Sequence, residues 1–226
     1  MAGGALGALR AVVRGGQRRQ RSSASWLKRQ AADPVVAEAR RRGLRSRAAL
    51  KLEEMDRALA LFRPGQVVVD LGASPGSWAQ VAAGRIGGAG RIIAADLLPI
   101  EPLDGVAVLQ MDVAAPDAVG RIVRSLGGGG AHVVLNDMAP NTSGVAAVDH
   151  LRSVALCEVG LEIATAVLLP GGTLLSKVFM GGHEQALRAS MLLRFDKVRM
   201  LKPASSRKES REVYVAALGF KPSELI

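Results

Sequence analysis

The chain has 226 residues, of which 49% are hydrophobic, so it is long enough to bury one sizeable core and short enough to form a single domain. No apolar run approaches the roughly 18 to 20 residues that cross a bilayer. The one cysteine, Cys157, can form no disulfide within the chain and offers no metal-ligand spacing. These features argue against a membrane protein, a disulfide-rich secreted scaffold and a metal site.

The net charge of +10 is concentrated at the N-terminus. Residues 1–51 hold thirteen Lys and Arg against two acidic residues, whereas the rest of the chain holds 17 basic against 18 acidic residues. A Lys or Arg that neutralises a phosphate releases a condensed counterion, whatever sequence is bound. The charge distribution therefore predicts a polyanionic partner.

Residues 1–21 form a basic extension that is rich in Gly, Ala and Arg and contains no acid. Such a composition is typical of a mitochondrial transit peptide. It also fits an unstructured basic arm of a bacterial protein, because its glycines weaken any helix. We favour the transit peptide, and with it the mitochondrial matrix, and keep the bacterial cytoplasm as the alternative. Residues 22–226 are expected to form one domain.

Two basic helices are expected in residues 34–61. The first begins after Asp33 and ends before Gly43. The second spans Ser46–Leu61, with Ser46 as its N-cap.

From Gly65 onward, short apolar runs alternate with helical patterns, which is typical of an α/β fold with strands buried on both faces. The expected helices are Ser77–Ile86, Val148–Leu169, which Pro170 would end, and Glu184–Leu193. The expected strands are Val67–Leu71, Arg91–Asp96, Val106–Asp112, His132–Asp137, Thr173–Phe179, Lys197–Leu201 and Glu212–Leu218.

The loop after the first strand carries small residues, Gly72, Ala73 and Gly76, which let a ligand approach the backbone closely. It lies where open α/β sheets bind ligands. It contains neither G-x-G-x-x-G nor G-x-x-x-x-G-K-[ST], so it supports neither a dinucleotide nor a nucleoside triphosphate.

Four aspartates stand at the ends of the expected strands and are predicted to face one crevice. They would repel one another without a cationic partner, and a methionyl sulfonium with its ammonium group is a fitting one. Acids at such positions can also bind the ribose hydroxyls and the amino group of an adenosine. The four are Asp70, Asp96, Asp112 and Asp137.

Several segments in the same order resemble the FtsJ/RrmJ family of RNA 2′-O-ribose methyltransferases, in its bacterial or mitochondrial type. The resemblance covers about residues 22–221 and is carried by the segments 22–27, 43–56, 62–78, 90–106, 136–144, 170–179 and 202–214, together with Val148, Asp149 and Arg152. It implies a Rossmann-like methyltransferase fold, with a seven-stranded, mostly parallel sheet and helices on both faces. It also implies S-adenosylmethionine-dependent methylation of a uridine ribose in large-subunit ribosomal RNA. Residues 22–226 would then be a single methyltransferase domain that includes the basic helices 34–61.

The resemblance assigns roles to particular residues. Its catalytic tetrad falls on Lys51, Asp137, Lys177 and Glu212, with Lys177 as the proton acceptor. This agrees with the chemistry, because a ribose hydroxyl is a poor nucleophile at neutral pH and gains from a base. The cofactor contacts fall on Gly72, Pro75, Gly76, Trp78, Asp96, Asp112 and Asp137, and no metal is implied.

Two positions depart from the pattern of the family. Leu50, beside the first catalytic lysine, stands where many relatives carry an aromatic residue, and this bears on stacking of the target base rather than on the methyl chemistry. Asn136 stands where serine is usual.

Two basic groups flank the tetrad and predict a phosphate-binding surface around it. Only 3% of residues are aromatic, which argues against a stacking platform for single strands. We therefore expect a monomer that binds structured ribosomal RNA within a ribosomal particle, and neither DNA nor a membrane. The basic groups are Arg40–Arg47 and the set Lys197, Arg199, Lys202, Arg207, Lys208 and Arg211.

Two other functions compete with methyl transfer. A Rossmann-type oxidoreductase is disfavoured by the missing glycine fingerprint. A catalytically silent RNA-binding or ribosome-assembly factor of the same fold would be favoured by loss of a tetrad residue, and all four are present.

Overall fold

The computed structural model describes residues 33–207 and 209–222. In this part of the chain seven strands form one sheet in the order β3-β2-β1-β4-β5-β7-β6. Only β7 runs antiparallel to its neighbours, β5 and β6. The strands are β1 (Val67–Leu71), β2 (Arg91–Asp96), β3 (Val106–Gln110), β4 (Ala131–Asn136), β5 (Leu168–Phe179), β6 (Phe195–Leu201) and β7 (Glu212–Phe220).

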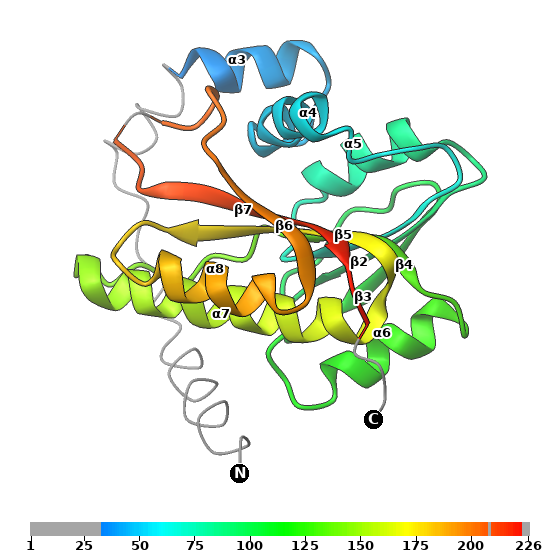
Figure 1. The fold of residues 1–226 in the computed structure, drawn as a ribbon. Helices are drawn as coiled ribbons and strands as arrows, with labels where there is room; N and C mark the ends of the chain where they lie inside the picture. The colour runs from blue at the N-terminus through cyan, green and yellow to red at the C-terminus, as the bar shows by residue number, and fades with distance from the viewer. Residues whose placement is uncertain (1–32, 208, 223–226) are drawn as a thin grey trace.

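Helices cover both faces of this sheet (Figure 1). One face carries α3 (Pro34–Arg41), α4 (Ala48–Leu59) and α5 (Ser77–Ile86). The other face carries α6 (Ala118–Leu126), α7 (Ala146–Val167) and α8 (Glu184–Leu192). The expected Rossmann-like fold with a seven-stranded, mostly parallel sheet is therefore confirmed.

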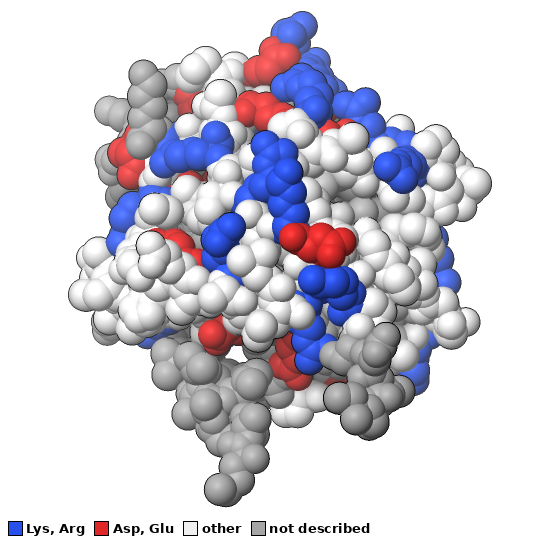
Figure 2. Space-filling view, viewed as in Figure 1, with Lys and Arg blue, Asp and Glu red and all other residues white. Residues whose placement is uncertain are grey.

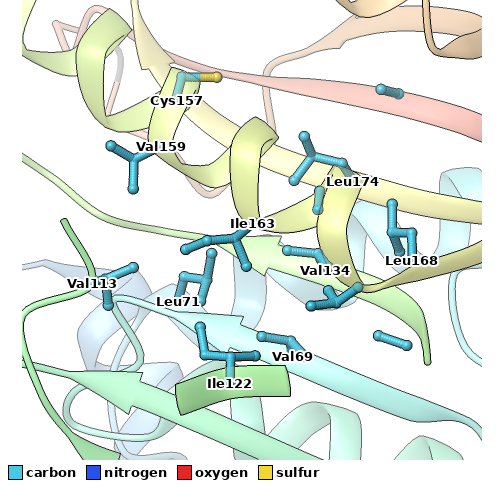
Figure 3. Close-up of a cluster of buried hydrophobic side chains, with 14 of the residues drawn as sticks. Val69, Leu71, Val113, Ile122, Val134, Cys157, Val159, Ile163, Leu168 and Leu174 are labelled. Atoms are coloured by element: carbon cyan, nitrogen blue, oxygen red, sulfur yellow. The ribbon is translucent and has the colours of Figure 1, made fainter. Parts of the chain in front are cut away.

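The core has two layers because successive side chains of a strand point to opposite faces of the sheet. Val69 and Leu71 of β1 pack with Ile122 and Ile163 of the helices below, as Figure 3 shows. Val68 joins the other layer, beneath α4 and α5. The same alternation on β5 and β7 places Lys177, Glu212 and Tyr214 on the α4–α5 face, at the end of the sheet where the parallel strands finish.

The first basic helix begins as predicted. Asp33 is its N-cap, and the carboxylate of Asp33 accepts a hydrogen bond from the backbone N–H of Val35 at 3.0 Å. The predicted N-cap of the second helix was wrong, because α4 begins at Ala48 and its N-cap is Arg47. Ser46 lies one residue earlier, where its hydroxyl lies 2.7 Å from the hydroxyl of Ser77.

Two other expectations need correction. Helix α6 was missed, although Ala118, Ile122 and Leu126 lie four residues apart and form its buried side. The strand expected to start at Thr173 starts at Leu168, directly after α7, because Leu168 already pairs with Ala131. The register shift that follows this pair accommodates Pro170-Gly171 within the strand.

The described residues contain no helix with the length and apolarity that a bilayer crossing requires. The expected basic extension, residues 1–21, lies outside the described residues.

Candidate active site

A cavity of about 400 Å³ opens at the carboxyl ends of β1, β2 and β4. This is the place where open α/β sheets bind ligands. Its lining combines three carboxylates with apolar side chains, so it suits a ligand that has both a cationic and an apolar part. The lining residues are Gly72, Ser74, Asp96, Leu97, Leu98, Asp112, Val113, Asp137, Met138, Ala139, Pro140, Asn141 and Leu156.

Four of the predicted cofactor residues line this cavity, namely Gly72, Asp96, Asp112 and Asp137. Asp96 also shapes its rim, because its two carboxylate oxygens accept hydrogen bonds from the backbone N–H groups of Ser74, at 2.9 Å, and Leu98, at 2.8 Å. Gly72 has a φ of +71°, and a Cβ at this position would lie 2.8 Å from the backbone of Met138. Glycine is therefore required where the cofactor loop meets the turn after β4.

The other three predicted cofactor residues, Pro75, Gly76 and Trp78, lie outside the cavity lining. Trp78 is only 2% exposed, and its indole N–H donates to the carbonyl of Ala48 in α4 at 2.9 Å. Its ring packs against Tyr214, with 5.6 Å between the ring centroids. These contacts hold α4 and α5 to the sheet, and a contact of Trp78 with the cofactor stays a prediction.

The prediction that Asp70 faces the crevice is wrong. Its side chain is fully buried in β1 and takes no part in the cavity lining. Burial raises the pKa of the Asp70 carboxyl well above its ordinary value, and the nearby charges of Asp137 and Asp96 act in the same direction. The structure therefore favours a neutral acid at this position.

The predicted tetrad comes together as two ion pairs. Lys177, from β5, places its ammonium 3.0 Å from the Asp137 carboxylate, and it also donates to the backbone carbonyl of Asp137. Lys51, from α4, places its ammonium 2.5 Å from the carboxylate of Glu212, at the start of β7. All four side chains are at least four-fifths buried, with exposed fractions between 8% and 20%.

Tyr214 joins the two pairs, and sequence reasoning had not included it in the site. Its hydroxyl donates to the Asp137 carboxylate at 3.0 Å, and its ring lies 5.9 Å from the ammonium of Lys51. The signal was present, because Tyr214 follows Glu212 by two residues and so shares its face of β7. Burial raises the pKa of the Tyr214 phenol well above its ordinary value, and Asp137 and Glu212 add to the shift, so the hydroxyl remains a donor at neutral pH.

The charge state of Glu212 depends on its lysine partner. Burial acts to raise the pKa of the Glu212 carboxyl, but the charge and hydrogen bond of Lys51 outweigh it, aided by the charge of Lys177. The pKa of Glu212 therefore lies below its ordinary value, and its carboxyl group is ionised at neutral pH.

Much of the predicted basic surface is engaged within the protein. Arg47 and Arg207 both pair with Asp33, and the guanidinium of Arg45 donates to the backbone carbonyls of Pro75, Glu101 and Pro102 at 2.8 Å. Lys208 lies outside the described residues.

Other basic side chains of the predicted surface remain at the molecular surface. Arg40, Lys197 and Arg199 are exposed, the last two on the edge strand β6. Figure 2 shows Lys and Arg gathered across the face that this edge presents.

The family model and the curated relatives that match this chain describe methyltransferases. Residues 44–220 match the family described as FtsJ-like methyltransferase. A protein of Xanthobacter autotrophicus is 51% identical over 216 residues, which are 94% of this chain and 85% of the relative. A protein of Afipia carboxidovorans is 47% identical over 224 residues, which are 98% of this chain and 99% of the relative. Both relatives are named ribosomal RNA large subunit methyltransferase E.

Solved structures share the fold. A Plasmodium falciparum protein, provisionally named a ribosomal RNA methyltransferase, superposes with a TM-score of 0.73 at 26% identity, covering 79% of this chain and 100% of that one. Fibrillarin from Aeropyrum pernix, solved with S-adenosyl-L-methionine, has a TM-score of 0.50 at 16% identity, covers 77% of this chain and 75% of its own, and shows the fold alone. The matches over nearly the whole length show that this chain belongs to the FtsJ-like methyltransferase family.

Proposed function

We propose that the protein transfers a methyl group from S-adenosylmethionine to the 2′-oxygen of a uridine ribose in large-subunit ribosomal RNA. The observation that carries this proposal is the pairing of Lys177 with Asp137, because Asp137 also lines the cavity at the carboxyl ends of the strands. The names of the bacterial relatives support the ribosomal substrate.

The residues of the cavity fit S-adenosylmethionine. The cavity volume of about 400 Å³ lies within the range of small-molecule sites, and its acidic lining suits a sulfonium and an ammonium group. Asp96 would hold the ribose hydroxyls, Asp112 the adenine amino group and Asp137 the cationic methionine end. The cofactor supplies an electrophilic methyl group on its sulfonium.

The residues of this chain would then do two things. Asp137 would hold Lys177 beside the cavity. Once the Lys177 ammonium has released a proton to solvent, its neutral amine accepts the proton of the ribose hydroxyl as the oxygen–carbon bond forms and the sulfur–carbon bond breaks. Glu212 and Lys51 stand next to this pair across Tyr214 and hold the ribose. Alignment of oxygen, carbon and sulfur supplies most of the acceleration.

The exposed basic residues would contact RNA phosphates and thereby orient the particle without reading its sequence. The relatives are bacterial proteins and give no support to the mitochondrial location that we favoured. We therefore place the activity in a bacterial cytoplasm.

The proposal is tested with undermethylated large-subunit particles and methyl-labelled S-adenosylmethionine. The wild type should label the RNA at a ribose that becomes resistant to alkaline cleavage. Lys177→Ala should abolish transfer and keep cofactor affinity, measured by calorimetry. Lys221→Ala is the matched control, because within the described part of the chain this exposed lysine pairs with the exposed Asp196, and the variant should keep full activity.

Full activity of Lys177→Ala would overturn Lys177 as the proton acceptor. A wild type that binds the particles and transfers no methyl would instead indicate a catalytically silent assembly factor. Label on a base rather than a ribose would refute the 2′-oxygen as the acceptor.

A further inference from the structure

Asn136 is a polar residue in an apolar layer. It is the last residue of β4, it is 1% exposed, and it directly precedes Asp137. Because side chains alternate along a strand, Asn136 faces α7 whereas Asp137 faces Lys177 on the other side of the sheet. A buried carboxamide is costly unless its donors and acceptor are satisfied.

The carboxamide of Asn136 makes three hydrogen bonds, each to a different element. Its nitrogen donates to the backbone carbonyl of Leu156 in α7 at 3.1 Å and to the hydroxyl of Ser176 in β5 at 2.9 Å. Its oxygen accepts from the backbone N–H of Met138 at 3.2 Å. One side chain thus fixes β4 to α7, to β5 and to the turn that follows it.

The bond to Ser176 lies directly beside the Lys177–Asp137 pair. Asn136 and Ser176 are cross-strand partners in the sheet, so the residues that follow each of them are Asp137 and Lys177. The Asn136–Ser176 bond therefore fixes β4 and β5 relative to each other one residue before the contact between Lys177 and Asp137. It does so from the opposite face of the sheet.

The bond to Met138 controls the turn over the cofactor loop. The backbone of Met138 comes so close to Gly72 that a Cβ there would lie 2.8 Å away. Both Gly72 and Met138 line the cavity. Asn136 therefore determines where Asp137 stands relative to the cavity as well as relative to Lys177.

Space for this carboxamide is reserved by a glycine in the middle of α7. A Cβ on Gly160 would overlap the side-chain nitrogen of Asn136. Glycine is unfavourable within a helix, so its presence here needs a packing reason, and Asn136 supplies one.

We propose that Asn136 is a positioning residue for methyl transfer, which aligns the Asp137–Lys177 pair with the cofactor cavity through its bonds to Ser176, Leu156 and Met138. The inference rests on the function proposed above and adds to it a residue that does not touch the reacting atoms. It also gives Gly160 a role in this positioning, because Gly160 leaves room for the carboxamide of Asn136.

The test compares the wild type, Asn136→Ala, Gly160→Ala and the double variant in single-turnover methyl transfer with saturating cofactor and RNA. Asn136→Ala should lower the transfer rate about 10- to 100-fold, as expected for misplacement on the ångström scale, while cofactor affinity stays within about threefold. Gly160→Ala should also slow transfer, because its methyl group displaces the carboxamide. In the Asn136→Ala background the same change should cost much less, because only the Cβ of residue 136 remains, at 3.3 Å from the added methyl group.

Val159→Ala is the control for packing alone, since Val159 is buried on the same helix and makes no side-chain hydrogen bond. It should lower the melting temperature and leave the transfer rate unchanged. The inference is overturned if Asn136→Ala transfers at the wild-type rate, if Gly160→Ala is equally harmful in both backgrounds, or if Val159→Ala slows transfer as much. A wild type without transfer refutes the proposed function itself, whereas an active wild type with an equally active Asn136→Ala refutes only this inference.

Discussion

Replacing Lys51 by methionine tests how the buried charges of the site are balanced. Lys51 and Glu212 are 12% and 13% exposed and their charged atoms are 2.5 Å apart, so they form a buried pair rather than a surface one. Removing one partner of such a pair typically costs about 3–5 kcal/mol, because the other charge stays buried without compensation. Methionine keeps the length and helix propensity of lysine, so α4 itself should persist.

The structure places the expected loss near the lower end of that range. Glu212 keeps a hydrogen bond from the Ser206 hydroxyl at 3.2 Å, and the charge of Lys177 still favours its ionised form. We therefore expect Lys51→Met to lower the free energy of unfolding by about 3 kcal/mol at pH 7. The loss should shrink as the pH falls, because a lowered pKa of Glu212 stabilises the fold only above the ordinary carboxyl pKa of about 4.3.

The assay is urea unfolding followed by circular dichroism between pH 4 and pH 8 for four proteins, with roughly constant ionic strength. The set is the wild type, Lys51→Met, Glu212→Gln and the double variant. In the double variant the unpaired charge is gone, so stability should return to within about 1 kcal/mol of the wild type. A double variant as unstable as Lys51→Met, or a loss independent of pH, would refute the reasoning that an uncompensated carboxylate causes the destabilisation.

Three further predictions follow from buried groups around the site. Asp70→Asn should raise the free energy of unfolding at neutral pH and make it fall less steeply as the pH rises. The reason is that burial and Asp137 raise the pKa of Asp70, so the folded protein holds a proton that the unfolded chain releases. Unfolding curves at pH 5 and pH 8 check this. Cys157 should resist alkylation at pH 8 in the folded protein and react at once in denaturant, because burial raises the pKa of its thiol to about 12, as mass spectrometry would show. Gly72→Ala should lower cofactor affinity at least about tenfold in calorimetry, because its positive φ and the backbone of Met138 leave no room for a Cβ; unchanged affinity would contradict the closeness of this contact.

Most elements could be predicted from the sequence because they depend on local periodicity, whereas the tetrad was implied by the resemblance to the family. Strand ends mark one edge of a parallel sheet, so Asp137 was expected beside the cofactor loop, and the resemblance supplied the partners. Alternation along β7 is sufficient to place Tyr214 near Glu212, but it does not indicate that the Tyr214 hydroxyl donates to Asp137. Helix α6 was missed although its buried side repeats every four residues.

The partners of the basic residues could not be predicted in this way. Asp33 and Arg207 are 174 positions apart, and no local pattern indicates that an N-cap residue will also receive two arginines. A count of charges overestimates the surface available to RNA for this reason. The orientation of Asp70 could not be predicted either, because a position at the end of a strand does not indicate whether its carboxylate faces the cavity or the core.

The residues that were expected at the cofactor and lie outside the cavity still bear on catalysis through α4. Arg45 donates to the carbonyl of Pro75, and Trp78 donates to the carbonyl of Ala48, so the cofactor loop with its following helix is fastened to the start of α4 at two points. Lys51 lies one turn beyond Ala48 and is the only member of the tetrad that a helix carries. A change in the cofactor loop therefore moves Lys51 relative to the sheet that carries the other three. Because of this connection, a loss of activity on mutating Pro75 or Trp78 would not by itself indicate a cofactor contact, and cofactor affinity must be measured separately from the rate of transfer.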